Sequence, residues 1–312
     1  MYIEVIKHSK KWITLSTISF IIFLGMFLVK GLNYGIDFTG GSLIQLNYTN
    51  NITLTDINKE LDELAVEIPQ LSSTARKVQV SQADNNVIIR TAEMSDKETE
   101  KLLTNLQTLG DYKLERAEKV GATIGEELKT SAIYALTIGG LLIVLYITMR
   151  YEFKFAIAGI LTLLHDVTAA LGVIALLGYE VDTPFIAAIL TILGYSINDT
   201  IIIYDRIRES LRKKSDLTFG EVLNKSLNQV LVRSINTSVT TLLALVAILV
   251  FGGDSLRTFT TTLLVGIGVG TYSSIYISTP LVYLFEKKRD DKYEPKKDDD
   301  DDNSHPEEKI VV

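Results

Sequence analysis

Long apolar runs with few charges are the dominant pattern along this chain of 312 residues. A helix needs about 17–25 mainly apolar residues to cross the hydrocarbon core of a bilayer. Six segments approach that length, and they predict transmembrane helices at 12–29, 130–149, 155–177, 184–204, 232–251 and 258–285. The first apolar run exceeds the ~7–15 residues of a signal-peptide core, so we expect an anchor that is retained. The pattern predicts a polytopic α-helical membrane protein.

Lysine and arginine collect on one side of these predicted helices. They cluster in 1–11, 150–154, 205–233 and 286–289, whereas the short loops of the other side carry only Arg257. Basic residues favour the cytoplasmic side of a membrane. We therefore expect both termini in the cytoplasm and residues 30–129 on the far side.

Residues 30–129 show the shorter periods of a small water-soluble domain. Alternating or β-rich patterns predict strands at 42–48, 77–80, 87–90 and 112–120. Leucine and isoleucine recur at helical spacing from 54 to 64 and from 102 to 109, which predicts two helices. The order β-α-β-β-α-β predicts an extracytoplasmic α+β domain of the split βαβ, ferredoxin-like type.

Residues 205–231 are expected to form a cytoplasmic loop that contains an amphipathic helix. Thr218 and Glu221 have the spacing of a capping box, and one apolar face follows them. This helix is expected to lie on the membrane surface. The alternative is a helix packed only against protein.

Composition narrows the class of protein further. The net charge is −7, and residues 290–308 carry ten acids against three lysines, so 286–312 are expected to form a disordered acidic cytoplasmic tail. The absence of cysteine excludes disulfides, thiolate metal sites and thiol nucleophiles, and three scattered histidines do not indicate a zinc site. We expect neither an enzyme, nor a bound cofactor or metal, nor a nucleic-acid partner.

Ionisable side chains are rare inside the predicted spans, and they are His165, Asp166 and Asp199. Burying a charge there costs at least ~2.5–3.5 kcal/mol on insertion scales, so such residues are functional candidates by default. A carboxyl group avoids this cost by protonating, by pairing with a cation or by reaching water. All three options suit a group that loads and unloads protons.

Asp199 has a candidate cation in Arg233, at the start of the fifth predicted span. Polar residues continue from Arg233 at helical spacing: Asn236, Thr237, Thr240 and Thr241. Asn198 and Ser196 add polar groups within about one turn of Asp199. A carboxylate that faces a guanidinium across a hydroxyl-lined seam favours a proton relay. The alternative is a snorkelling arginine and a static structural acid.

His165 and Asp166 are secondary candidates for the same relay. Adjacent helical residues point about 100° apart, so the two side chains are not expected to face one partner. A hydrogen-bonded contact between helices and a role in proton transfer both remain open. Asp205 and Arg206, at the end of the fourth span, are expected to be ordinary interfacial charges.

Four motifs resemble the SecD/SecF family of protein-export membrane subunits, on its SecF side. Gly35-Ile-Asp-Phe-Thr-Gly-Gly41 is similar to the family's glycine motif, and Leu164-His-Asp-Val167 to its His-Asp element. The stretch from Gly194 to Glu209 is similar to the long signature of the fourth span. Arg233-Ser-Ile-Asn-Thr-Ser238 is similar to the start of the fifth.

This resemblance implies a fold like half of a resistance-nodulation-division transporter, in a prokaryotic cell membrane. It implies a SecD partner that supplies a second half, and a function in pulling unfolded exported chains through SecYEG after SecA has acted. The proton gradient would drive that step, with Asp199 and Arg233 as the proton-linked acid and arginine. Asp37, Gly40 and Gly41 would form a hinge between the first span and the outer domain, since glycine tolerates unusual backbone angles.

Two other functions are alternatives for the same layout. A small-molecule exporter half would need a second six-span half and large outer domains, and the outer domain here has only about 100 residues. A passive scaffold would only stabilise its partner.

Overall fold

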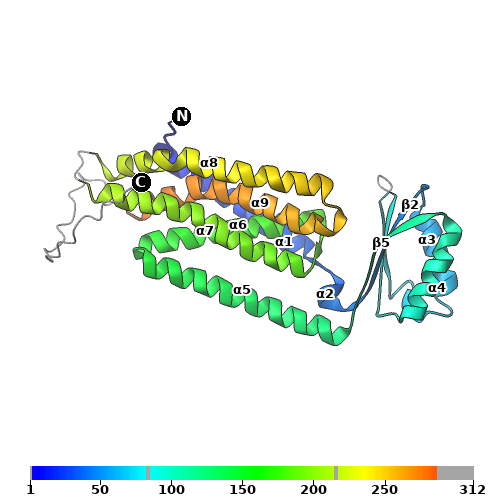
Figure 1. Ribbon diagram of the computed structural model, residues 1–312. Helices are drawn as coiled ribbons and strands as arrows, with labels where there is room; N and C mark the ends of the chain where they lie inside the picture. Colours follow the sequence, from blue (N-terminus) through cyan, green and yellow to red (C-terminus); the bar gives the residue numbers. More distant parts are fainter. Residues whose placement is uncertain (1, 82–84, 214–216, 287–312) are drawn as a thin grey trace, which may run out of the picture.

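The computed structural model describes residues 2–81, 85–213 and 217–286. A bundle of long helices carries a small sheet domain at one end, and the chain starts at the opposite end (Figure 1). The long helices are α1 (Ser9–Lys30), α5 (Ala122–Arg150), α6 (Phe153–Leu177), α7 (Thr183–Leu211) and α8 (Phe219–Phe251). They are followed by α9 (Arg257–Ser273), a π-helical turn (Ser274–Ser278) and α10 (Thr279–Phe285). The predicted acidic tail lies almost wholly outside the described residues.

Within the described residues, five helices are long and apolar enough to cross a membrane by themselves: α1 and α5 to α8. The sixth predicted span is divided, because the π-helical turn separates α9 from α10. Pro280 lies at the start of α10 and has no backbone N–H to bond into the preceding turn, and a π-helical turn accommodates such a break.

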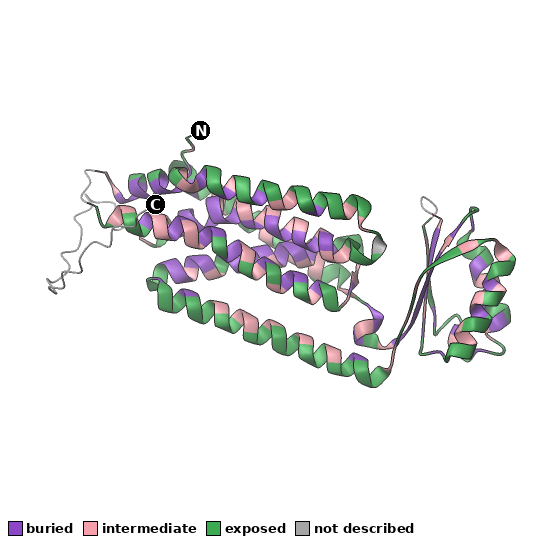
Figure 2. Cartoon of the chain, in the orientation of Figure 1, coloured by how far each residue is buried: buried purple, intermediate pink, exposed green. Residues whose placement is uncertain are grey.

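The outer faces of the bundle are exposed, whereas its interior is buried (Figure 2). Along α5 only Gly125 and Ile147 are buried, and large side chains such as Leu141 are more than half exposed. Exposed apolar surface of this extent is stable only against lipid or another protein. The chain is therefore a multi-pass membrane protein.

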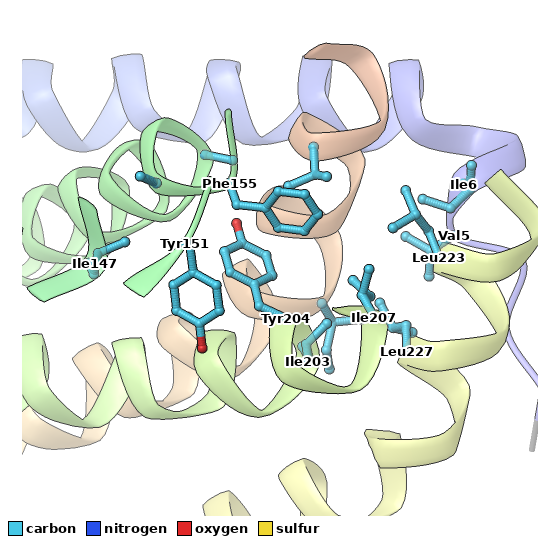
Figure 3. Close-up of a cluster of buried hydrophobic side chains, with 14 of the residues drawn as sticks. Val5, Ile6, Ile147, Tyr151, Phe155, Ile203, Tyr204, Ile207, Leu223 and Leu227 are labelled. Carbon is cyan, nitrogen blue, oxygen red and sulfur yellow. The ribbon is translucent and has the colours of Figure 1, made fainter. Parts of the chain in front are cut away.

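The helix α8 differs from the expected surface helix. Thr218 and Glu221 form the predicted capping box, but the helix then runs without interruption into the fifth apolar segment. Its first apolar face packs against protein, with Leu223 and Leu227 beside Val5 and Ile6 (Figure 3). The cause is the N-terminal segment: the Asn224 and Asn228 side chains accept hydrogen bonds from its backbone N–H groups, at 2.8 Å from Val5 and 2.7 Å from Ile3.

The sheet domain has four antiparallel strands in the order β3-β4-β2-β5. The strands are β2 (Gly41–Tyr48), β3 (Lys77–Ser81), β4 (Asn86–Thr91) and β5 (Tyr112–Val120). The helices α3 (Leu54–Leu64) and α4 (Asp96–Leu106) cover the face turned away from the bundle (Figure 1). Each begins with a capping box, and their leucines fill the core with Leu46 and Ile89 of the sheet.

A short junction joins the sheet domain to the bundle. After α1, β1 (Asn33–Tyr34) pairs in parallel with β6 (Glu180–Val181), which lies between α6 and α7. The short helix α2 (Ile36–Thr39) then leads into β2. An ion pair between Arg90 of β4 and Glu180 holds the sheet against this junction. Single 3-10 turns lie at Ile6–His8, Pro69–Leu71, Gln107–Leu109 and Asp254–Leu256.

Candidate functional site

Two carboxyl groups are buried inside the bundle, on the contacting helices α6 and α7. Asp166 of α6 is fully buried, and Asp199 of α7 is 2% exposed. The other polar groups around them are almost all hydroxyls from α1, α7, α8 and α9. Such groups persist in a membrane interior only where they find hydrogen-bond partners.

Asp166 has partners on every side. Ser196 of α7 and Ser273 of α9 donate hydrogen bonds to its Oδ2, at 2.5 and 2.7 Å. The Nδ1 of His165 lies 3.0 Å from its Oδ1, and the Nε2 of His165 lies 3.0 Å from the hydroxyl of Ser19 in α1. Four helices therefore meet at one carboxyl group through side chains of this chain alone.

The side chains of His165 and Asp166 contact different helices, as expected for adjacent positions, and they also contact each other. They face different helices, α1 on one side and α7 with α9 on the other. The imidazole also bonds the neighbouring carboxyl, because rotation about the side-chain bonds overcomes the 100° between adjacent positions. Gly270 favours this geometry, since a Cβ there would lie 3.1 Å from the Cβ of Ser196 and would press α9 away.

Asp199 faces α8 through a pair of serines that the sequence analysis did not single out. The hydroxyls of Ser234 and Ser238 are the polar groups of α8 nearest its carboxyl, although among the described residues neither forms a hydrogen bond of ordinary geometry with it. Thr271 of α9 donates to the hydroxyl of Ser238 at 2.6 Å. The sequence could have indicated these serines by their spacing, because residues four apart, such as Ser234 and Ser238, lie on one face of a helix.

Arg233 does not pair with Asp199 in this structure, contrary to the expected facing pair. Among the described residues no ion pair joins the two, and Arg233 is exposed. Asn236 and Thr237 are exposed as well, and so is Asn198 on α7. The reason is helical phase, because turning Ser234 inwards turns Arg233, about 100° away, to the outside of α8.

The exposed polar stripe on α8 is nevertheless attached to α7. The hydroxyl of Tyr195 donates to the backbone carbonyl of Thr237 at 3.1 Å and lies 3.0 Å from the hydroxyl of Thr241. The hydroxyl of Thr237 bonds the carbonyl of Arg233 at 2.9 Å. The arginine therefore starts a polar face that this chain leaves uncovered next to Asp199.

The predicted hinge residues lie at the junction with the sheet domain. Asp37 accepts a hydrogen bond from the backbone N–H of Thr183 at 2.9 Å, and Asp182 accepts one from Phe185 at 2.9 Å. Both carboxyl groups therefore cap α7, where the helix dipole favours negative charge. Burial raises the pKa of Asp182, and the nearby charge of Asp37 raises this pKa further.

Gly40 and Gly41 are required by close contacts as well as by backbone angles. Their φ values are +69° and +120°, which side chains rarely adopt. A Cβ on Gly40 would lie 3.0 Å from the Cα of Ala122, and one on Gly41 would collide with the carbonyl oxygen of Thr91. The junction is thus tightly packed around both glycines.

No group of three or more His, Cys, Asp or Glu side chains that could hold a metal ion occurs within the described part of the chain. The described polar side chains inside the bundle include hydroxyls, one imidazole and two carboxyls.

Comparisons with known proteins confirm the family resemblance. The family described as "Protein export membrane protein SecD/SecF, C-terminal" matches residues 98–288, and the "SecD/SecF GG Motif" matches residues 25–52. The protein translocase subunit SecF of Sebaldella termitidis is 45% identical over 314 residues, covering 100% of both chains. That of Haemophilus influenzae is 37% identical and covers 94% of this chain and 89% of the relative.

A solved structure shares the fold as well. The crystal structure of SecDF from Thermus thermophilus, a translocon-associated membrane protein, superposes with a TM-score of 0.82 at 35% identity. The match covers 92% of this chain and 39% of the SecDF chain. By family profile, by relatives along its whole length and by structure, the chain belongs to the SecF family of protein translocase subunits.

Proposed function

We propose that this chain and a SecD partner use the proton motive force to promote late steps of protein export through a SecYEG channel. The relatives named as SecF translocase subunits support the role in protein export. In this proposal SecA drives unfolded chains into the channel, and the present chain acts on them afterwards. Its role is mechanical transport and not catalysis.

The observation that carries the proton-coupling proposal is the environment of Asp199. Its carboxyl is buried among hydroxyls, while Arg233 lies exposed one residue away from Ser234. Hydroxyl partners accommodate a protonated carboxyl, whereas an ionised one needs a cation or water at that depth. Deprotonation of Asp199 therefore favours a state in which α8 turns Arg233 towards it.

The arginine acts as an electrostatic partner in this scheme. A guanidinium stays charged at every relevant pH, so Arg233 cannot carry the proton itself. One proton that crosses about 100 mV supplies about 2.3 kcal/mol. That energy suffices to shift two conformations that differ by a few kcal/mol. Asn198, Asn236 and Thr237 would line the seam in the turned state, and His165 with Asp166 would form its inner end.

The partner proposal rests on the polar face of α8. Arg233, Asn236 and Thr237 are exposed on a helix long and apolar enough to span a membrane. Polar side chains at such positions normally face a protein interior or a water-filled cavity. The SecDF protein of Thermus thermophilus is more than twice as long as this chain, which spans 39% of it. A SecD half would cover this face.

We extend the proposal to the number of membrane spans, the orientation of the chain and the outer domain. The α9, π-turn and α10 segment forms a sixth span, so that the bundle resembles half of a resistance-nodulation-division transporter. Both termini lie in the cytoplasm of a prokaryotic cell, and the Asp37–Gly41 segment is a hinge. The strand order β3-β4-β2-β5 supports a ferredoxin-like outer domain.

The test is export in membrane vesicles with an imposed proton gradient. Asp199→Asn and Arg233→Met should keep assembly with SecD and ATP-driven entry of substrate, but lose the gradient-dependent late step by about tenfold or more. Asp205→Asn is the matched control, because this acid of α7 lies more than one turn beyond Asp199 and its side chain is 45% exposed. Full gradient sensitivity of Asp199→Asn would refute the relay and favour a passive scaffold. Dye export without SecD would favour a small-molecule pump.

A further inference from the structure

An apolar slot lies between α5 and the pair α6 and α7, on the side of the bundle away from α8. Its volume is about 540 Å³. Leu136 and Gly140 line it from α5, Leu163 and Val167 from α6, and Ile189 from α7. Lys129 is its one charged lining residue among those that the structure describes.

The slot exists because α5 is held at its two ends. Near the sheet domain, Gly125 packs on the backbone of Gly40, where a Cβ would lie 3.0 Å from the Gly40 nitrogen. At the other end Ile147 is buried beside Tyr151 and Tyr204. Between these ends α5 touches α7 at Gly139, where a Cβ would lie 2.9 Å from the Cδ2 of Leu190, whereas a Cβ on Gly140 would meet no atom within 4 Å. The slot therefore opens beside Gly140.

We propose that this slot binds one acyl chain of a membrane phospholipid, with the headgroup phosphate at Lys129. The lining extends along α5 from Lys129 to Val144, a rise of about 22 Å. It is therefore longer than one leaflet of the hydrocarbon core, about 15 Å. Its exposed rim includes Leu164, 53% exposed, so the slot opens sideways to lipid.

The shape and lining of the slot suit an acyl chain. The slot is elongated along α5, and all but one of its lining residues are uncharged, most of them apolar. The residues of this chain after Glu286 do not suit such a lining, because they are mostly charged. A methylene chain matches both the elongated shape and the apolar lining.

The mouth of the slot suits a phosphate. The ammonium of Lys129 is 3.6 Å from the carboxylate of Glu126, but both side chains are more than half exposed, and such pairs are weak. Tyr34, in the junction that follows α1, also lines the slot and is 56% exposed. A lysine and a tyrosine at the end of an apolar surface are the residues that anchor proteins at a lipid headgroup region.

The test uses the full-length chain in vesicles of phosphatidylethanolamine and phosphatidylglycerol. A trace of phosphatidylglycerol with a diazirine near the end of one acyl chain is photolysed, and labelled peptides are mapped by mass spectrometry. Labelling should be about threefold or more higher at Leu136 and Leu163 than at Leu141, which is 62% exposed outside the slot. Equal labelling would overturn the proposal.

Two filling variants and one control complete the experiment. Ala132→Trp places a large side chain in the slot, whereas Ala135→Trp lies on the exposed side of the same helix. The first should abolish the excess labelling and the second should leave it unchanged. Gly140→Phe is the second filling variant, chosen because its site is open. Excess labelling that persists in both filling variants, with normal elution on size exclusion, would overturn the proposal.

The headgroup is tested separately. A diacylglycerol with the same diazirine chain lacks the phosphate, so it should label the slot several-fold less than phosphatidylglycerol does. Lys129→Glu should remove that difference. Equal labelling by the two lipids in the unmodified chain would overturn the assignment of the phosphate to Lys129.

Discussion

The helical bundle and the sheet domain differ in where their charged and their large apolar side chains lie. In the sheet domain the interior is made mainly of leucine, isoleucine and valine, and Arg76 is the one charged residue buried there among those that the structure describes. In the bundle, Asp166, Asp199 and many serines and threonines are buried, while large apolar side chains such as Leu141 and Val250 are exposed. Figure 2 shows the exposed outer faces of α5 and α8.

The difference follows from the solvent around each part. Water drives apolar side chains of the sheet domain inwards. Lipid offers no such force to the bundle, whose helices associate through packing and hydrogen bonds. A polar side chain inside the bundle therefore has a specific reason to be there, either a structural bond such as those of Asp166 or a function such as that proposed for Asp199.

The largest expected effect is the loss of stability when a leucine is truncated to alanine in the sheet domain, compared with the same change in the bundle. Leu61→Ala in α3, fully buried, should lower the free energy of unfolding of the sheet domain by about 2–5 kcal/mol. Leu141→Ala on the lipid face of α5 should change bundle stability by less than about 0.5 kcal/mol. Hydrogen exchange of the α3 amides measures the loss in the sheet domain, and steric trapping measures the loss in the bundle. Equal losses would contradict the comparison.

The next effect concerns the carboxyl that holds four helices. Asp166→Ala removes the acceptor of Ser196, Ser273 and His165, and hydrogen bonds in membranes contribute about 0.6–1.7 kcal/mol each. We expect a loss of about 2–4 kcal/mol by steric trapping in bicelles. Thr168→Ala is the control, since its hydroxyl bonds only the Leu164 carbonyl of its own helix. A loss no greater than the control would show that the network is not structural.

A smaller effect is expected where the two parts meet. Gly41→Val combines an unfavourable φ of +120° with a collision against Thr91, and should cost about 1–3 kcal/mol. Gly31→Val has a positive φ but no neighbour within 4 Å, so it reports the strain alone. Gly41→Val should insert into membranes normally, cleave faster near the junction in limited proteolysis and impair export. Identical behaviour of the two variants would make the close contact at Gly41 irrelevant.

The smallest expected effect is a dependence of local stability on pH, in the sheet domain. Hydrogen bonds from the backbone and hydroxyl of Ser95 hold the pKa of Glu98 below its ordinary value of 4.5. A lowered folded-state pKa adds stability above the unfolded-state pKa, and that stability is lost as pH falls through the folded-state pKa. The first turn of α4 should therefore lose exchange protection progressively as pH falls below the ordinary value of 4.5.

Glu98→Gln should remove this pH dependence, and Glu100→Gln in the same helix should not. Hydrogen exchange of α4, corrected for its intrinsic pH dependence, measures both variants. Persistence of the pH dependence in Glu98→Gln would assign it to another group.

Local patterns anticipated much of the architecture. The alternation at 112–120 corresponds to β5, and the spacing of Thr218 and Glu221 marks the start of α8. The motifs around Gly35–Gly41 and Gly194–Glu209 carried the family assignment. The sequence also indicated His165, Asp166 and Asp199, because a charge inside a membrane span is visible in the sequence alone.

What each of these side chains contacts was decided by the tertiary structure. Ser273 is 107 residues from Asp166 and becomes its partner only when α9 packs against α6. Arg233 matched Asp199 by type and depth, yet the phase of α8 turns Ser234 and Ser238 inwards instead. Periodicity determines which residues share a face of one helix, because it is a property of the local backbone. Which face meets which neighbour depends on packing between helices far apart in the chain, and that is where the site takes its form.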